Sequence, residues 1–359
     1  MEHEFEINDM RGESEFKGFS FSKFKKADTK KELLNSLIHS KVEPACYWSA
    51  ELICAGHYTD LWEVILLFFS KYVHLSNSNI AIYLEMRISD FKVIVNNGFS
   101  DNILRLRNSE KIRKLFSELI CILCDAKRRH SFDNVKIKSD DLNMLTIKDK
   151  FKAPSTEYAE EVFTTEDPNE LFPFINEFAY SLTASGNNQM NACYWIEWII
   201  EFENICKAKK EKLFCERRTF AKVDSKCQKD IAWMIWDALL NEAKKRSKIV
   251  QKLMDSLLSL FCLKYTTGCH KRRKNILYLA ISVLCETFVL DKEIIRHSQL
   301  ELVTTIKKKI NLVYAQIKKN EESTGMEYLF HGIKSSNLET TIAKLEKMNT
   351  FGETFVPRV

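Results

Sequence analysis

The sequence predicts an all-α fold, and three observations support this prediction. Glycine and proline are scarce, with nine and five copies in 359 residues, whereas their usual shares are about 7% and 5%. Between Asn187 and Thr324 there is one glycine, Gly268, and no proline. Hairpins and sandwich turns need these residues, but helices need few of them. Apolar residues also recur at helical spacing in several long segments. We expect a multi-helix globular bundle, arranged either as one body or as two helical lobes.

The composition indicates a folded protein without a membrane span. Apolar residues make up 45% and charged residues 29% of the chain, which is ordinary for a globular domain. The N-terminal stretch MEHEFEINDMRGESEF is acidic and lacks the apolar run of a signal peptide. The longest apolar segments, Leu61 to Phe69 and Ile276 to Leu290, contain glutamates and are too short to cross a bilayer. Eleven cysteines without a secretory signal favour reduced thiols packed as small apolar side chains.

Changes in composition divide the chain into five predicted parts. Residues 1–28 are polar with interspersed phenylalanines, so we expect a loosely ordered arm that docks through its aromatic rings. Residues 29–130 form a predicted N-terminal helical lobe. Residues 131–170 carry two of the five prolines and are predicted to be a linker or surface excursion. Residues 171–290 form a predicted second lobe. Residues 291–359 form predicted peripheral amphipathic helices and a tail.

The first strongly predicted elements are two consecutive helices in residues 45–73. Gly56 is expected to end a helix that begins near Ala45, because glycine enters the left-handed conformation at little cost. Asp60 is expected to be the N-cap of the next helix, with Glu63 completing a capping box. This second helix is apolar around most of its circumference, which indicates a buried helix.

Three later regions also have helical spacing. A helix is predicted from about Glu110 to Lys127, and another from about Ile231 to Leu263, with an apolar stripe that includes Trp233 and Trp236. Beyond Asp291, amphipathic helices are predicted at about 300–319 and 326–348.

Two blocks of sequence resemble a known family. They are PACYWSAELICAGHYTDLWEVILLFFSKYVHLSNSNIAIYLEMR, from Pro44 to Arg87, and ACYWIEWIIEFENICKAKKEKLFCERR, from Ala192 to Arg218. Together they resemble an uncharacterised all-helical protein family of nucleocytoplasmic large DNA viruses, the giant viruses, over about residues 21–286. The resemblance implies no established reaction. It implies a protein of the host cytoplasm or of a virion assembled there, with other viral proteins as partners.

Two short motifs occur twice in the chain. Ala-Cys-Tyr-Trp stands at 45–48 and 192–195, and Cys-x-Ala-Lys stands at 124–127 and 206–209. The two pairs are separated by unequal lengths of sequence, which argues against a simple tandem repeat. A diverged duplication of a helical lobe and chance recurrence both remain open.

The cysteine motifs offer candidate metal or thiol chemistry. Cys121 and Cys124 form a CxxC, but zinc would need two more ligands and no second motif has suitable spacing. Their apolar neighbours favour buried structural thiols. Cys269 and His270 stand in KYTTGCHKRRK, where the basic residues could lower a thiol pKa. Adjacent residues do not define a catalytic dyad, so nucleophilic catalysis is the less favoured interpretation.

Other sequence features favour structure over catalysis. His57 stands in a predicted turn near Glu51 and Glu63, where a hydrogen bond to the backbone is the favoured role. The chain contains no GxxxxGK[ST], no dinucleotide-binding glycine fingerprint and no HExxH. The tryptophan pairs Trp195–Trp198 and Trp233–Trp236 have the spacing of a helix core stripe. We therefore predict no catalytic residue, no metal and no cofactor.

Basic clusters are the clearest signal of a binding function. They lie at 127–130, 207–212 with 217–218, 244–246, 271–274 and 307–309. If several share one face, they would attract nucleic-acid phosphates. The favoured alternative is that they lie near helix C-termini, where cations stabilise the helix dipole and increase solubility. The candidate phosphate contacts are Arg128, Arg129, Arg217, Arg218, Lys271, Arg272, Arg273 and Lys274.

Together these features give two hypotheses for function. The first is a non-enzymatic viral interaction protein that is virion-associated or acts in assembly. The second is an RNA- or DNA-binding factor in viral transcription or translation that uses the basic clusters.

Overall fold

The computed structural model describes residues 5–132, 135–143, 145–289 and 293–322, and nearly all of the regular structure in these ranges is helical. The described residues contain no strand, and only an isolated antiparallel bridge joins Phe19 to Lys25. The predicted all-α class is therefore confirmed. No helix in the described ranges is long and apolar enough to cross a membrane.

The chain divides into two compact units, each built from separated segments. The first unit contains residues 1–68, 86–126 and 293–359, and the second contains residues 69–85 and 127–292. This division differs from the predicted lobes, which followed chain order. Residues 131–170 belong to the second unit rather than to a linker.

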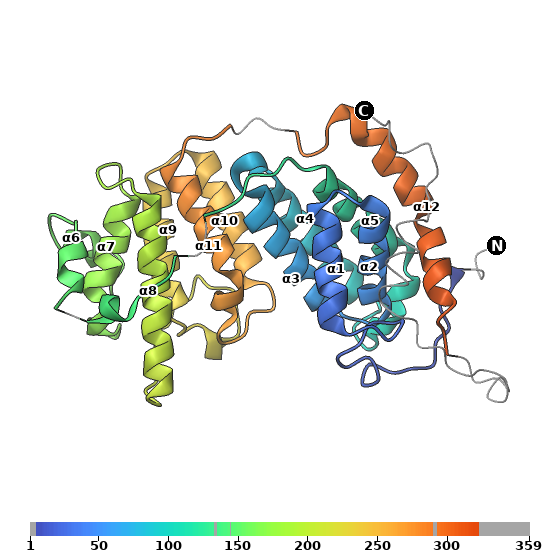
Figure 1. Cartoon of the computed structure of the whole chain (residues 1–359), viewed down its shortest axis with the longest axis horizontal. Helices are drawn as coiled ribbons and strands as arrows, with labels where there is room; N and C mark the ends of the chain where they lie inside the picture. The colour runs from blue at the N-terminus through green and yellow to red at the C-terminus, as the bar shows by residue number, and fades with distance from the viewer. Residues whose placement is uncertain (1–4, 133–134, 144, 290–292, 323–359) are drawn as a thin grey trace. The chain divides into compact units, whose positions relative to one another are not determined.

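The first unit is organised around α2, which spans Val42–Cys54. It packs against α1 (Lys26–Ile38), α5 (Glu110–Asp125) and α12 (Leu300–Lys318), and Figure 1 shows these four helices. The start of α5 agrees with the prediction. Helix α12 buries a full apolar stripe, so it is part of the core and not peripheral. The second predicted C-terminal helix, at 326–348, lies outside the described residues.

Five further helical segments lie between residue 58 and residue 108. Helix α3 spans Tyr58–Phe68 and packs against α1 and α2. It is followed by a π-helical turn, η2 (Phe69–Val73), and a 3₁₀ turn, η3 (His74–Asn77), both in the second unit. Helix α4 spans Ile80–Asn96, and the 3₁₀ helix η4 spans Ile103–Asn108.

The N-terminal arm is packed against the first unit from residue 5 onward. Phe16, Phe21 and Phe24 are buried, as expected for docking through aromatic rings. The carboxylate of Glu51 in α2 accepts hydrogen bonds from Ser22 N at 2.9 Å and Ser22 Oγ at 2.5 Å. Burial raises the pKa of Glu51, although these hydrogen bonds act to lower it. The expectation of a loosely ordered arm is therefore wrong for the described part.

The turn between α2 and α3 agrees in part with the prediction. Gly56 has φ of +75° and follows the end of α2, as expected. His57 hydrogen-bonds backbone, with its Nε2 2.7 Å from the carbonyl oxygen of Phe19. Asp60, however, is not the N-cap, because the carbonyl of His57 already accepts the N–H of Leu61 at 3.0 Å. The Asp60 carboxylate instead pairs with Lys26 at 3.0 Å and Lys30 at 2.8 Å.

The described residues of the second unit contain six complete α-helices, together with the first residues of α4 and several short turns. The six complete helices are α6 (Glu157–Glu160), α7 (Phe172–Leu182), α8 (Gln189–Ala208), α9 (Ala232–Lys244), α10 (Lys248–Cys262) and α11 (Cys269–Cys285). Helix α7 packs against α8 and α9, and α11 packs against α8, α9 and α10. The four tryptophans of the two predicted pairs are at most 1% exposed, which confirms their place in the core.

The single helix predicted over 231–263 is two helices, α9 and α10. The N–H groups of Lys245 and Arg246 bond back three residues, to Glu242 and Ala243, which tightens and ends α9. Ser247 is extended, with ψ of 154°, and α10 begins after it. The side chain of Gln251 then donates to the carbonyl of Arg246 at 2.9 Å. The apolar residues keep their helical spacing across the break, so this spacing alone could not show that one helix ends and another begins.

Side chains of α7 and α8 form hydrogen bonds with the backbone of the segment 131–170. The indole N–H of Trp198 donates to the carbonyl of Asp141 at 2.7 Å. The Glu177 carboxylate accepts the N–H groups of Lys152 at 2.8 Å and Ala153 at 2.9 Å. Buried polar side chains of α7 and α8 thus fix a stretch whose composition resembles a linker.

The repeated Ala-Cys-Tyr-Trp motif has similar local packing in the two units. The rings of Tyr47 and Trp48 meet edge to face with centroids 5.2 Å apart, and those of Tyr194 and Trp195 do so at 4.9 Å. Both tryptophans are buried. Similar packing is compatible both with a diverged duplication and with chance recurrence of the motif. The duplication therefore stays a prediction.

We predict that Gly56→Ala lowers the free energy of unfolding by at least about 1–2 kcal/mol, because a side chain at positive φ is strained. The new Cβ would also lie 3.0 Å from Cδ2 of Leu104. Urea unfolding followed by circular dichroism measures the change. Gly12→Ala is the control, since its Cβ would meet nothing closer than 4.0 Å and its φ is not positive. An equal, small effect of both substitutions would contradict the argument.

Candidate functional site: a buried acid–histidine centre

Three elements of the second unit bring Glu203, Asp230 and His270 together. Gly268, with φ of +79°, turns the chain into α11 and places His270 in its first turn. Glu203 lies in the last part of α8, and Asp230 lies just before α9. One ligand atom from each residue lies within 4.8 Å of the others, and all three side chains are buried. We call this group the acid–histidine centre.

Both nitrogens of His270 face a carboxylate oxygen. Nε2 lies 3.1 Å from Oε2 of Glu203, and Nδ1 lies 3.2 Å from Oδ1 of Asp230. A neutral imidazole could donate only one hydrogen bond, whereas the imidazolium donates both. Burial alone would lower the pKa of His270, but the hydrogen bonds to Asp230 and Glu203 raise it above its ordinary value. The two carboxylate acceptors therefore favour the imidazolium form of the ring.

The two carboxylates are held as anions. Burial opposes ionisation of Glu203, but hydrogen bonds from His270 and Lys207 bring its pKa down to about 2. Lys207 Nζ lies 2.6 Å from Oε1 and Lys271 Nζ lies 3.2 Å from Oε2 of Glu203. The pKa of Asp230 is also lowered: burial acts to raise it, but the hydrogen bond and charge of His270 together with the hydrogen bond from the Ala232 N–H outweigh burial.

The donor set resembles that of a divalent metal site, because imidazole and carboxylate bind zinc and related ions. The charges argue against a metal here. A metal would have to displace the proton of His270, and the ammonium groups of Lys207 and Lys271 already lie within 3.2 Å of Glu203. The centre is best explained as a buried ion-pair network in which the imidazolium of His270 lies between two carboxylates.

A second buried network surrounds Arg218, whose side chain is 6% exposed. Its Nη2 lies 2.5 Å from Oδ2 of Asp167, and its Nε lies 2.5 Å from Oδ2 of Asp237. Nη2 also donates to the carbonyl of Val162 at 3.1 Å. The guanidinium thus links the 157–170 region to α9.

Four of the eight predicted phosphate contacts are buried, or are only partly exposed and paired with carboxylates of the second unit. Arg218 and Arg273 are buried, and Arg273 donates from Nη1 to the carbonyl of Phe261 at 2.6 Å. Lys271 and Lys274 pair with Glu203 and Glu197, respectively. Arg218 and Arg273 therefore cannot contact phosphate in this conformation, which corrects their assignment.

The other four predicted contacts are exposed: Arg128, Arg129, Arg217 and Arg272. Arg129 forms an ion pair with Glu286, and Nε of Arg217 donates to Oε1 of Gln228 at 2.6 Å. Phosphate binding by these four stays a prediction.

Within α11, helical spacing could have separated the buried Arg273 from the exposed Arg272 in advance. In α11, His270, Arg273 and Leu277 lie three and four residues apart on the buried face, and neighbours in a basic run point to different faces of a helix. Glu203 and Asp230 were not singled out, because isolated acidic residues in a helix and a loop give no local signal.

The candidate thiols are inaccessible. Cys121, Cys124 and Cys269 are at most 2% exposed. Burial raises the pKa of Cys121 to about 12, so it is protonated at neutral pH. Because the thiolate is the reactive form, packing explains Cys121 and Cys124 better than chemistry does.

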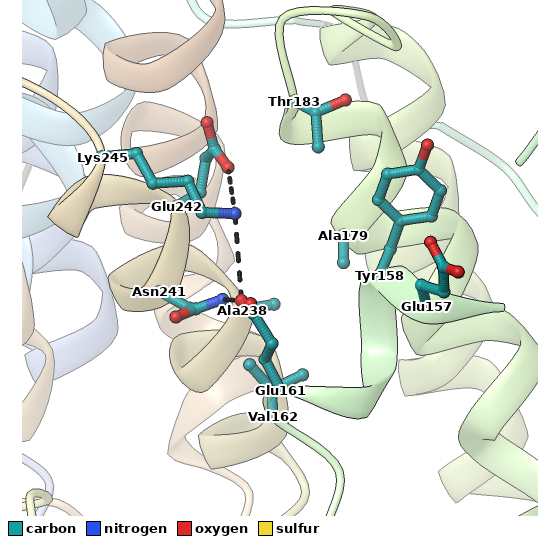
Figure 2. A pocket seen from close by; sticks show the side chains of 10 residues that line it. All are labelled: Glu157, Tyr158, Glu161, Val162, Ala179, Thr183, Ala238, Asn241, Glu242 and Lys245. Atoms are coloured by element: carbon teal, nitrogen blue, oxygen red, sulfur yellow. Dashed lines mark hydrogen bonds and ion pairs between the residues drawn. The ribbon is translucent and has the colours of Figure 1, made fainter. Parts of the chain in front are cut away.

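An open acidic hollow of about 210 Å³ lies in the second unit, and Figure 2 shows the side chains that line it. Three glutamates and Lys245 contribute its charged groups. Glu161 accepts the side-chain N–H of Asn241 at 2.6 Å, and Lys245 Nζ lies 3.4 Å from Oε2 of Glu242. Since carboxylates outnumber cations in the lining, the hollow suits a basic group better than an anion.

No family model matches this chain, and neither a curated protein nor a solved structure is similar to it at a significant level.

We predict that His270→Gln destabilises the protein by about 3–5 kcal/mol, because the substitution leaves the buried carboxylate of Asp230 without its cation and leaves Glu203 with only its lysine partners. The raised pKa of His270 gives stability below pH 6.5 that is lost as pH rises through the folded value. The Glu203 pKa of about 2 gives stability above pH 4.5 that is lost as pH falls. The difference between wild type and variant should thus be largest from pH 4.5 to 6.5.

Denaturant unfolding from pH 3 to pH 9 measures this difference. His39→Gln is the control, because His39 is exposed at the end of α1. A difference that does not change with pH would show that His270 acts only through packing.

The adjacent arginines provide a matched test of the second network. Arg218→Gln should lower the free energy of unfolding by about 3–5 kcal/mol, because Asp167 and Asp237 would lose their buried partner. Arg217→Gln should change it by no more than about 0.5 kcal/mol, because Arg217 is exposed. Thermal or urea unfolding compares the two variants. Similar losses of stability in the two variants would refute the conclusion that only Arg218 belongs to a buried network.

Proposed function

We propose that this chain is a non-enzymatic interaction protein that acts by binding other proteins. The observation that supports this proposal is where the chemically versatile side chains lie. The CxxC thiols and Cys269 are buried, and His270 is held between two carboxylates. These groups stabilise the fold, which favours recognition over catalysis.

The acidic hollow supports a role in protein contact. Glu157, Glu161 and Glu242 lie in its lining. Such a surface complements the basic side chains of a partner and would contribute to specificity. The resemblance to the giant-virus family supports a viral partner, in the virion or in its assembly in host cytoplasm.

Nucleic-acid binding is the second candidate, and one exposed segment favours it. Lys209, Lys210 and Lys212 are exposed after α8, and the nearby Phe214 is 50% exposed. Basic side chains beside an exposed aromatic ring can follow a phosphate backbone and stack on a base. This segment differs from the basic clusters that are paired within the unit.

We predict that tagged protein purified from infected cells retains viral structural proteins after nuclease treatment, because protein contacts do not depend on bound nucleic acid. Mass spectrometry of the treated and untreated samples measures this. Loss of all partners after nuclease, with enriched RNA or DNA, would refute the proposal in favour of the second candidate.

A charge-reversal pair separates the two candidates further. Changing Lys209, Lys210 and Lys212 to Glu should leave the viral protein partners in place. The control changes Lys244, Lys248 and Lys252 to Glu, which are exposed on α9 and α10. Loss of salt-dependent nucleic-acid binding in the first triple variant alone would support the nucleic-acid candidate.

A further inference from the structure

The chain places an asparagine directly before a glycine at one position, Asn97-Gly98, just after the end of α4. The side-chain carbon Cγ of an asparagine can be attacked by the backbone nitrogen of the next residue, because the product is a five-membered ring. A following glycine favours this reaction, since it has no Cβ to hinder the approach and its backbone rotates freely. This dipeptide is therefore a candidate site of chemical modification.

Both groups that would react are accessible. Asn97 and Gly98 are exposed. Within the described ranges, neither the side-chain amide of Asn97 nor the N–H of Gly98 makes a hydrogen bond. The N–H groups on either side are bonded, since that of Asn97 donates to the carbonyl of Val93 at 3.1 Å and that of Phe99 donates to the carbonyl of Val95 at 3.1 Å. The attacking nitrogen thus has no hydrogen bond to lose.

The surroundings of Gly98 leave room for the reaction. Its φ is +100°, and a Cβ added at this position would meet no atom within 4 Å. A backbone in this region of φ is accessible to glycine at little cost. Neighbouring groups therefore do not block this side of the residue.

The fold protects the other asparagines that precede a small residue. Asn108 precedes Ser109, but its side chain accepts the N–H of Ile7 and donates to the carbonyl of Ile7, both at 2.9 Å. Asn35 precedes Ser36 in the interior of α1, where helical hydrogen bonds occupy the backbone N–H groups. Asn97 differs from both, because its side chain and the N–H that follows it are free of such bonds.

We propose that Asn97 is a site of spontaneous deamidation in the folded protein. Base removes the proton of the Gly98 N–H, and the nitrogen attacks Cγ of Asn97. The new N–Cγ bond forms as the Cγ–Nδ2 bond breaks, and Nδ2 takes up a proton and leaves as ammonia. Water then opens the cyclic imide at either of its two carbonyl carbons, which gives aspartate or isoaspartate. The only co-reactant is water.

The product changes the end of α4. A carboxylate replaces the amide beside the C-terminus of the helix, where the helix dipole disfavours negative charge. Isoaspartate also adds a methylene group to the backbone, next to the bond from the Asn97 N–H to the Val93 carbonyl. The converted fraction increases with time, so it records the age of the molecule. The inference is independent of the proposed protein contacts, because the site lies in the first unit and the acidic hollow in the second.

Peptide mapping by mass spectrometry of the full chain, kept at 37 °C and pH 8, tests the proposal. A synthetic peptide of residues 92–102 is the unstructured reference. Because exposed segments at helix ends open at almost no cost in free energy, we expect Asn97 in the full chain to convert within about tenfold of the rate in the peptide. A rate more than about tenfold below that of the peptide would show that the fold protects Asn97 and would overturn the proposal.

Two further measurements assign the reaction to this site. Asn97→Gln should reduce the ammonia released by the full chain, because glutamine would have to form a larger ring. Unchanged ammonia release would place the reaction at another residue and overturn the assignment. Asn108, followed in the same digests, should stay unconverted, because Ile7 holds its side chain. Conversion of Asn108 as fast as that of Asn97 would show that unfolding, and not local exposure, controls the reaction.

Discussion

An imidazolium ion held between two buried carboxylates is the interaction on which the second unit depends. His270 joins α11 to α8 through Glu203 and to the start of α9 through Asp230. Burying these charges is favourable only while each has its partner. The nearby basic residues are then used to balance the acids, as Lys271 does for Glu203. The run at 271–274 that resembles a phosphate-binding cluster is thus largely part of the fold.

The helical class and several helix limits could be predicted from local sequence. The rarity of glycine and proline, and the position of Gly56 after α2, depend on residues close together in the chain. The break between α9 and α10 could not be predicted in this way, because the apolar spacing continues across it. The place of residues 131–170 was missed for a related reason: their polar backbone is satisfied by Glu177 and Trp198, which lie in later helices.

The candidate site was only half visible in the sequence. His270 stood out beside Cys269 and a basic run, but its two carboxylates come from elements far away in the chain. Arg217 and Arg218 are adjacent and chemically identical, yet one is exposed and the other is buried between two aspartates. Counting charges in the sequence cannot show which of two adjacent arginines is buried. Helix phase can do so where a helix is known, as for Arg273 in α11, but Arg218 lies in an irregular segment.

The division into units also sets an order for folding during synthesis. All segments of the second unit have been translated once residue 292 is made, whereas the first unit needs α12, which ends at Lys318. Helices α1, α2 and α5 must therefore wait, with the surface that α12 will cover still exposed, while the ribosome makes residues 127–292, the longer segment of the second unit. Exposed apolar surface of this kind invites aggregation or chaperone binding. Truncation anywhere before α12 would leave the earliest part of the chain without its last core helix.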